Sequence, residues 1–251
     1  QGHWDGSVTA LGLKQIDALA ERFRTVHVDA LYASDLYRTR LTASAITRYH
    51  DLPMQLRPAL REINVGSWEA RFFGDVAYEQ PEAMHDFIFD PEKWQAPGAE
   101  TYAEVGQRAY AELIRIAREM PLKGTETEAL LRRQMECNLA IAREGLKGSW
   151  GATIGQILLA RDADDPAVKA RAWAAAASDA RMNGCELPVV IVSGSGNQGI
   201  TASVPVAIFG EALHSTDEEV IRALLLSDLV TIALKQGIGK LSAYCGAVSA
   251  G

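Results

Sequence analysis

The sequence predicts an α/β segment followed by a mainly α-helical segment. In the first half, a short apolar strand pattern at residues 30–34 stands between two amphipathic helical patterns. In the second half, from about residue 126, helical patterns dominate. The stretch MPLKGTETE at 120–128 contains helix-breaking proline and glycine between the two. We therefore place a domain boundary there, giving segments 1–120 and 121–251.

Composition and charge restrict the functional classes. Of the 251 residues, 48% are hydrophobic and 23% charged, which is ordinary for a soluble globular protein. The formal net charge of -7 offers no electrostatic footprint for nucleic acid. No apolar run approaches the roughly 20 residues that span a bilayer, so no membrane insertion is expected. The chain has three cysteines, an odd and widely spaced set, which argues against a disulfide framework and favours a reducing, cytoplasmic compartment.

The first half contains a regular order of predicted elements. Thr9 is a plausible N-cap for the first helix, and Leu36, Ala43 and Ile46 are expected to face inward from the second. The region at 71–98 is rich in aromatics and prolines without a clear period, and it is expected to form an inserted cap. The other expected elements are a helix at 9–24, a strand at 30–34, a helix at 35–49, a structured loop at 60–70 and a helix at about 100–119.

Helix start and stop signals organise the second half. Thr125 and Glu128 form a capping-box pattern, which predicts a helix beginning after the boundary. Asp165 followed by proline predicts a second helix start, and Gly184 predicts its end. The alanines at 174–177 allow this helix to pack closely against neighbours. A further helix is expected over 215–237, buried on a broad face.

A glycine-rich loop follows the apolar run Val189 to Val192, which has the composition of a strand. Within VVIVSGSGNQGITASVPV, three glycines spell G-x-G-x-x-G, the pattern of dinucleotide-binding loops. That fold also needs a helix and a second strand ending in an acidic residue. Here Pro205 is expected to interrupt any long helix, and the acids at 217–219 open a helix instead. We therefore expect neither NAD nor FAD, and no lysine completes a P-loop.

The polar residues of this loop favour a different role. A plain tight turn would need one glycine, whereas this loop combines its three glycines with serine and amide side chains. This composition suggests a cradle in which the backbone lines a substrate. The residues that we expect to bind the substrate are Ser193, Gly194, Asn197, Gln198 and Gly199.

A candidate anion site lies earlier, where ALYASDLYRTRLTASAI places Ser34, Arg38 and Thr42 around a strand end and a helix start. With QGHWDGSVTALGLKQIDALAERF, LREINVGSWEA and PGAETYAEVGQR, this block resembles the histidine phosphatase family, in the branch of the phosphoglycerate mutases. The resemblance implies an incomplete three-layer sandwich acting on a phosphomonoester. It also implies that Arg38 clamps the phosphoryl group, Glu62 protonates the leaving oxygen, and the Gly2 N–H binds phosphate.

Two histidines of that family lack counterparts in the sequence. The nucleophilic histidine of an Arg-His-Gly strand would precede Gln1, and no later histidine stands in a small-residue–His–Gly context. The histidines present are His3, His27, His50, His85 and His214. Transfer through a phosphohistidine needs the nucleophile, so we expect no hydrolysis by the sequence as it stands.

The second half resembles another family. The blocks CNLAIAREGLKG, AAAASDARMNGCELPVVIVSGSGNQGITASVPV and LSDLVTIALKQGIGKLSAYCGAV are similar to the α-domain of iron–sulfur L-serine dehydratases, and most similar to the L-cysteine desulfidase branch. The resemblance covers roughly 126–251. It implies a [4Fe–4S] cluster beside the glycine loop, with Cys245 as its first ligand, and conversion of L-serine or L-cysteine to pyruvate.

The sequence therefore predicts a fusion of a phosphatase-like and a lyase-like segment, each lacking part of its catalytic set. In the family the two further cluster cysteines lie downstream, so we expect the cluster to be incompletely ligated and the lyase activity to be negligible. The alternative is a non-catalytic fusion that at most binds phosphate or a partner. An open apolar flank is expected where the missing elements would pack, which favours self-association or a homo-oligomer.

Overall fold

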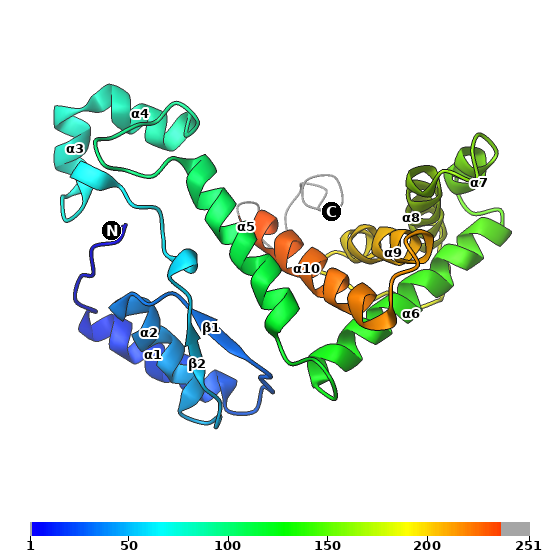
Figure 1. Ribbon diagram of the computed structural model, residues 1–251, viewed down its shortest axis with the longest axis horizontal. Coiled ribbons are helices and arrows are strands. Elements are labelled where there is room, and N and C mark those ends of the chain that lie inside the picture. The colour runs from blue at the N-terminus through cyan, green and yellow to red at the C-terminus, as the bar shows by residue number, and fades with distance from the viewer. Residues whose placement is uncertain (1, 237–251) are drawn as a thin grey trace. The chain divides into compact units, whose positions relative to one another are not determined.

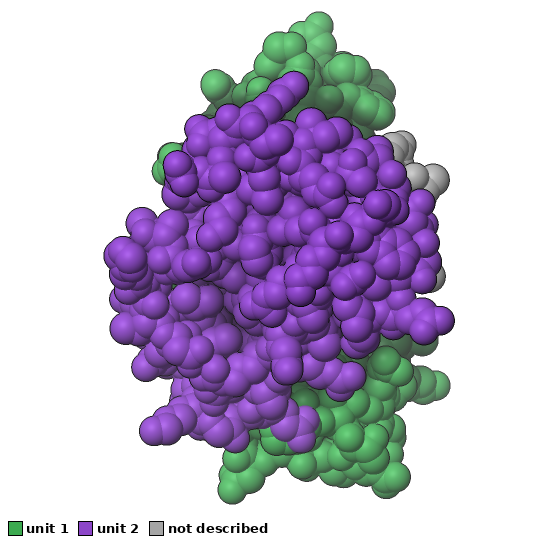
Figure 2. Space-filling view, turned by 90° about the vertical axis from the view of Figure 1, so that its right-hand side faces the viewer, with its two compact units in different colours: residues 1–115 green, residues 116–251 purple. Residues whose placement is uncertain are grey.

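The computed structural model describes residues 2–236 (Figure 1). The chain divides into two compact units, residues 1–115 and residues 116–251 (Figure 2). The division falls inside one helix, five residues before the boundary that we placed after residue 120. Across the described residues, no helix has the length and apolar character needed to cross a membrane.

The first unit begins with a pair of packed helices. Helix α1 (Ala10–Phe23) starts where the Thr9 hydroxyl accepts a hydrogen bond from the Gly12 amide, as the sequence predicts. Its buried face packs on Ala45 of α2 (Tyr37–Thr47), which has no exposed surface. The inward residue near the end of α2 is thus Ala45, whereas the expected Ala43 is only half-buried.

A two-stranded parallel sheet adjoins this helix pair. Strand β1 (Leu31–Ala33) confirms the predicted strand, and it pairs with β2 (Met54–Leu56), which the sequence pattern did not indicate. The register places Leu31 opposite Met54. Both strands have only three residues, too few for a visible alternating pattern in the sequence.

The region at 60–98 forms the rest of the unit around an aromatic cluster. Two short helices, α3 (Phe73–Glu79) and α4 (Pro81–Phe89), occupy the stretch for which no period was recognisable. Trp68 and Trp94 are 1% exposed, with ring centroids 5.2 Å apart in an edge-on arrangement. The preceding loop contains two single turns of 3₁₀-helix, Pro58–Leu60 and Gly66–Trp68.

Long helices carry the rest of the chain. Helix α5 (Tyr102–Glu119) contains the division between the units. The helices of the second unit are α6 (Glu126–Lys147), α7 (Ile154–Leu159), α8 (Pro166–Met182), α9 (Gly196–Ala212) and α10 (Asp217–Lys235). Asp165 caps α8 as predicted, and Gly184, with φ of +89°, follows its end.

The predicted capping box of α6 is only half formed. The Thr125 hydroxyl accepts from the Glu128 amide, as expected. The Glu128 carboxylate, however, accepts from the amide of Gly124 at 2.7 Å, because the Thr125 amide donates to the Leu122 carbonyl. A reciprocal capping box is instead found at α10, between Thr216 and Glu219.

Two expectations about the glycine-rich region are wrong. The run Val189 to Val192 is not a strand, and its only ladder contact is an isolated bridge between Val192 and Ser195. Pro205 does not interrupt the following helix, because it lies inside α9, which is continuous over its 17 residues. A short apolar run cannot by itself distinguish a strand from extended chain that lies on a helical core.

Glycine permits very close helix contacts in the second unit. A Cβ atom on Gly145 of α6 would lie 2.0 Å from the carbonyl oxygen of Ala176 on α8. A Cβ on Gly155 of α7 would lie 2.4 Å from the carbonyl oxygen of Ala172, which also lies on α8. The predicted close packing of the alanine-rich helix is therefore confirmed, with glycines supplying the facing positions.

Candidate functional site

Arg38 is the centre of the candidate phosphate site in the first unit. Its guanidinium donates from Nη2 to the Gly2 carbonyl at 2.7 Å and from Nη1 to the Trp4 carbonyl at 2.9 Å. The same Nη1 lies 3.4 Å from the Asp5 carboxylate. Arg38 and Gly2, both predicted as phosphate ligands, are therefore in direct contact, through the carbonyl of Gly2.

The anion site predicted at the start of α2 already holds a carboxylate. Asp5 accepts hydrogen bonds from the amides of Tyr37 at 2.5 Å and Arg38 at 3.3 Å. Leu36, the residue at the N-cap position, offers no side-chain oxygen. The start of α2 and the Arg38 guanidinium thus bind the same anion, the carboxylate of Asp5. Helix N-termini favour bound anions, and here the anion is a side chain of the protein itself.

Glu62 lies beside this group without touching Arg38. Its side chain is exposed, and Oε1 accepts from the adjacent Ile63 amide at 3.0 Å. Its carbonyl accepts from His3 Nε2 at 3.0 Å, which connects it to the segment that Arg38 holds. Burial, together with the charge of Glu62, raises the pKa of Tyr102, so the tyrosine stays neutral near the carboxylate.

Two further carboxylates fix the backbone of this site, and the sequence pattern did not single them out. Glu69 accepts from the amides of His3 at 2.8 Å, Trp4 at 2.7 Å and Val65 at 3.0 Å. Burial acts to raise the pKa of Glu69, but these hydrogen bonds outweigh it and lower the pKa below its ordinary value. Glu69 therefore stays ionised and holds residues 3–4 against the loop.

The second carboxylate, Glu100, pairs with Arg108 of α5. The guanidinium donates to both Glu100 oxygens, at 2.8 and 2.9 Å. The guanidinium also donates to the carbonyls of Ala59, Arg61 and Glu62. Its hydrogen bonds to the Glu100 carboxylate lower the pKa of Glu100. The sequence pattern did not single out these residues, because most of their other contacts are with backbone atoms, many of them more than 30 positions away.

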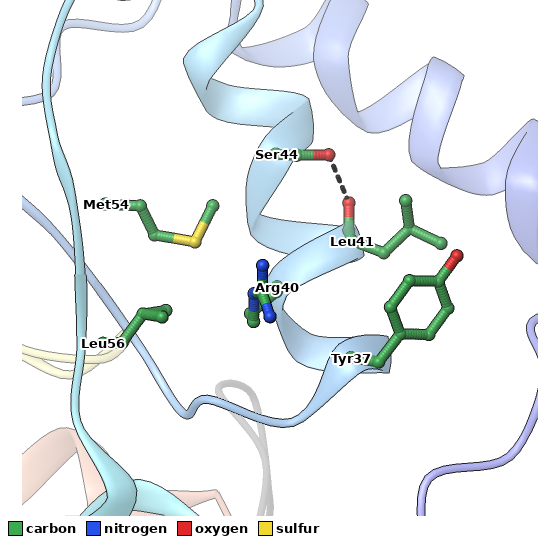
Figure 3. Close-up of a pocket in the computed structure, with 6 residues that line it drawn as sticks. All are labelled: Tyr37, Arg40, Leu41, Ser44, Met54 and Leu56. Carbon is green, nitrogen blue, oxygen red and sulfur yellow. Dashed lines mark hydrogen bonds between the residues drawn. The ribbon is translucent and has the colours of Figure 1, made fainter.

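A cavity of about 430 Å³ opens beside α2 and β2 (Figure 3). Its lining residues are Tyr37, Arg40, Leu41, Ser44, Met54 and Leu56. Figure 3 shows the Ser44 hydroxyl directed to the Leu41 carbonyl within the helix, a hydrogen bond of 2.7 Å. None of the three predicted phosphatase residues lines this cavity, so we assign it no part in the phosphate site.

The glycine loop of the second unit forms a tight turn before α9. Hydrogen bonds between the amide and carbonyl of Val192 and those of Ser195, at 3.1 and 3.2 Å, close the turn over Ser193 and Gly194. Both enclosed residues have positive φ, 45° and 85°. The Ser195 hydroxyl then caps α9 by accepting from the Gln198 amide at 3.3 Å.

Asn138 of α6 holds this loop against the helix that follows it. Its side chain has no exposed surface, and Nδ2 lies within hydrogen-bond distance of the carbonyls of Val190 and Gly199 and of the Ser203 hydroxyl. Its Oδ1 accepts from the Val190 amide at 2.9 Å. The sequence pattern did not indicate Asn138, since a single asparagine within a helical pattern carries no distinguishing signal.

Two of the loop glycines are explained by packing. A Cβ on Gly199 would lie 2.1 Å from the Val190 carbonyl oxygen, and one on Gly196 would lie 2.4 Å from Arg181 Nε. The G-x-G-x-x-G spacing therefore lets a loop and an arginine approach the first turn of α9. This geometry gives the glycines a reason that needs no dinucleotide.

The amide side chains of the loop face two different cations. Arg181 Nη1 of α8 donates to Asn197 Oδ1 at 3.0 Å, and Lys235 Nζ of α10 donates to Gln198 Oε1 at 2.8 Å. Gln198 has no exposed surface, and its Nε2 is buried without a hydrogen-bond partner. The predicted cradle residues are thus brought together at one helix terminus, with two cations that the sequence did not indicate.

Comparison with known proteins decides the family of the first half. The family model described as histidine phosphatase superfamily (branch 1) matches residues 1–125. Residues 1–125 carry a histidine phosphatase domain. The region in which Arg38 contacts Gly2, with Glu62 beside them, lies within it.

Several solved structures are also similar to part of the chain. Bacillus stearothermophilus YhfR is 26% identical, with a TM-score of 0.44, and the match covers 49% of this chain and 60% of YhfR. The alpha-ribazole phosphatase from Shigella flexneri is 27% identical, with a TM-score of 0.43, and the match covers 47% of this chain and 58% of that one.

Curated relatives carry a different name. The chain is 53% identical over 126 residues to a UPF0597 protein of Desulfitobacterium hafniense, and 55% identical over 125 residues to one of Lachnoclostridium phytofermentans. Each match covers 50% of this chain. The chain spans only 29% and 30% of the length of these two relatives.

The histidine phosphatase domain places one histidine at the site within the described residues. This is His3, whose Nε2 faces the Glu62 carbonyl and lies 3.7 Å from Glu100 Oε2. His27 pairs with Asp29, and the His50 ring contacts the Phe23 carbonyl, both away from the contacts of Arg38. His3 is thus held between a carbonyl and a carboxylate, and no contact joins its ring to Arg38.

The thiols that the structure describes do not fit an iron–sulfur cluster. Cys137 and Cys185 are free and half-buried, and Cys185 packs against the apolar core of the second unit. Over residues 2–236, no three histidine, cysteine or acidic side chains gather as metal ligands. Cys245, the predicted ligand, lies outside the described residues. We therefore derive no chemical step through a cluster.

Proposed function

We propose that the first half binds a phosphomonoester without hydrolysing it, and that the second half is the amino-acid-binding part of an iron–sulfur lyase. The substrate of the second half would be L-serine or L-cysteine. The observation that carries the first proposal is the anion held by Arg38 and the start of α2. The histidine phosphatase match over residues 1–125 supports a phosphoryl group as the physiological anion.

A phosphate would take the place that Asp5 now occupies. The same donors, two α2 amides and a guanidinium, suit phosphate oxygens as well as carboxylate oxygens. Asp5 would then act as an internal competitor. Glu62 lies exposed at the edge of this group, where it could face a leaving oxygen.

The absence of turnover is the second part of this proposal. His3 is held by the Glu62 carbonyl, and no contact brings it to Arg38. Among residues 2–236 no histidine contacts Arg38, so we propose that these residues by themselves form no phosphohistidine. We expect no hydrolysis of a generic aryl phosphate by the chain, measured as release of the phenol.

Calorimetric titration with inorganic phosphate tests the binding itself. Asp5→Asn should strengthen phosphate binding, because it weakens the competitor, whereas Arg38→Ala should abolish it. Arg22→Ala, on the exposed surface of α1, is the control and should leave binding unchanged. Robust aryl phosphate turnover that disappears in Arg38→Ala would overturn the proposal of a non-hydrolytic site.

Similar reasoning supports the amino-acid proposal for the second half. The loop presents the buried amide of Gln198 and a helix N-terminus, which suit a carboxylate.

We expect negligible pyruvate from L-serine or L-cysteine under anaerobic conditions with iron and sulfide supplied. A rate of about 1 s⁻¹ or more, typical of enzymes, would contradict this expectation.

A further inference from the structure

The start of α9 gathers cations that have no carboxylate partner within the described residues. Lys235 is 3% exposed, and its ammonium has a single hydrogen-bond partner there, Gln198 Oε1 at 2.8 Å. Arg181 donates to Asn197 Oδ1 and to the Met182 sulfur, but it makes no ion pair in that part of the chain. In the first unit, by contrast, the buried carboxylate of Glu112 pairs with Arg57 at 3.1 Å.

Such an arrangement is unfavourable unless an anion completes it. Withdrawing an ammonium from water is strongly unfavourable, and one amide oxygen offsets little of that cost. Arg181 makes the situation worse, because its guanidinium lies over Gly196 at the positive end of the α9 dipole. Two positive charges beside a helix N-terminus, with no carboxylate partner in residues 2–236, therefore favour the binding of an anion.

The buried amide of Gln198 supplies an independent indication. Its Oε1 is occupied by Lys235, while its Nε2 is buried with no acceptor. A buried donor without a partner is unfavourable, and native proteins rarely retain one. Within residues 2–236, Gln198 Nε2 therefore has no acceptor, and the Lys235 ammonium, which carries three N–H donors, has only Gln198 Oε1 as its acceptor.

We infer that the start of α9 is a carboxylate-binding subsite, with Lys235 and Gln198 as its ligands and Arg181 at its rim. The inference rests on the proposed amino-acid-binding function. It identifies the group of the amino acid that this site would bind, the α-carboxylate. A carboxylate accepts several hydrogen bonds, so it can take protons from Nζ of Lys235 and Nε2 of Gln198 together. The low-dielectric surroundings strengthen this charge pairing.

The neighbouring residues hold these ligands in position. The Ser195 hydroxyl fixes the first turn of α9, and Asn138 fixes its approach to the loop. Lys235 lies in the last turn of α10, where a cation is also favoured by the dipole of that helix. Three helices thus determine where the carboxylate would lie, and the substrate itself need contribute only its common α-carboxylate.

The test uses the ¹⁵N-labelled full chain titrated with L-serine, and L-serinamide as the probe that lacks the carboxylate. The side-chain amide resonance of Gln198 is identified by its loss in Gln198→Leu. L-Serine should shift this resonance, and L-serinamide should not. Lys235→Met should weaken L-serine binding by about tenfold or more, the loss expected for a hydrogen bond to a charged group.

Two variants guard against misreading a folding defect. Gln198→Glu should raise the melting temperature, because an internal carboxylate pairs with Lys235, and should abolish L-serine binding for the same reason. Lys169→Met, which removes a half-buried lysine paired with the exposed Glu211, should bind as the wild type does.

The outcomes separate the subsite from the proposed function. If L-serine binds without moving the Gln198 resonance, or binds Lys235→Met unchanged, the subsite inference is overturned while amino-acid binding stands. If neither L-serine nor L-cysteine binds the wild-type chain, the amino-acid function fails and this inference fails with it.

Discussion

Asp5 illustrates how one side chain can complete a helix that its own segment leaves uncapped. Its carboxylate accepts from the amides of Tyr37 and Arg38, 32 and 33 positions along the chain. Arg38 returns the contact through its guanidinium and also holds the carbonyls of Gly2 and Trp4. The candidate phosphate site is therefore also the anchor of the segment that precedes α1.

We expect Asp5→Ala to destabilise the protein by about 1 kcal/mol, because it removes the acceptor at the start of α2. Urea unfolding followed by circular dichroism measures this loss. Asp5→Asn should lose less, because an amide oxygen still accepts from the helix. Asp51→Ala, at an exposed aspartate, is the control. Equal stability of Asp5→Ala and the wild type would show that the contact contributes nothing.

Asp228 presents the opposite case, a carboxyl group that burial penalises. Burial raises its pKa from 3.8 to about 6, although Gln134 donates a hydrogen bond to it at 3.0 Å. The folded protein therefore keeps its proton at pH values where the unfolded chain has lost it. Stability is full below pH 3.8 and falls as the pH rises towards 6.

Asp228→Asn should remove this loss of stability and raise the unfolding free energy at pH 7, by about 3 kcal/mol at most. Asparagine keeps an oxygen for Gln134 and cannot ionise. Unfolding by urea at a series of pH values measures the effect. Asp217→Asn on the same helix is the matched control: Arg132 lowers the pKa of Asp217, so its contribution is lost as the pH falls. An unchanged slope between pH 4 and 6 in Asp228→Asn would contradict the assignment.

Among the elements, the contact of α6 with α8 depends most visibly on small residues. Gly145 lies directly against the backbone of Ala176, where a Cβ would be 2.0 Å from the carbonyl oxygen. This contact belongs to the core formed by α6, α8 and α9, which includes Ile141, Ala177 and Ile200. The same core supports the loop that presents Gln198.

Gly145→Ala should therefore destabilise the second unit by about 1–3 kcal/mol, the usual cost of overpacking. Gly106→Ala in α5 is the control, because its added Cβ would meet nothing nearer than 3.9 Å. At that position alanine should stabilise the helix by about 1 kcal/mol. Thermal unfolding of the two variants should shift in opposite directions, and a shared direction would refute the packing argument.

At the scale of the whole molecule, apolar side chains left on the surface bear on the expected self-association. Phe72, Tyr78 and Phe89 are 81%, 89% and 73% exposed, and all lie on or next to α3 and α4. Exposed aromatic groups in one region favour contact with another copy of the chain. The net charge of -7 opposes such association only weakly at physiological salt.

Phe72→Ser combined with Phe89→Ser should reduce self-association, because it removes two of these three aromatic side chains. Sedimentation velocity over a series of concentrations compares the variant with the wild type. Leu213→Ser, which removes an apolar side chain 72% exposed in the second unit, serves as the control. If the double variant sediments as the wild type does, these aromatics take no part in association.

The sequence by itself determined the features that depend on neighbouring residues. Thr9, Asp165 and Gly184 act within one helical turn, so the starts of α1 and α8 and the end of α8 were predictable. The histidine phosphatase family was also evident from the sequence, because its blocks occur in order along residues 1–119.

Only the tertiary structure decided features that join distant residues. It placed Asp5 in the anion site of Arg38, and it brought Lys235 to Gln198 across 37 positions. It also showed that the run before Ser193 is not a strand, because the buried side chain of Asn138 binds both polar backbone groups of Val190. A local sequence pattern indicates which backbone conformation a residue prefers. A hydrogen bond from a distant side chain can satisfy the backbone N–H and C=O groups in a different conformation, and the sequence pattern does not reveal that bond.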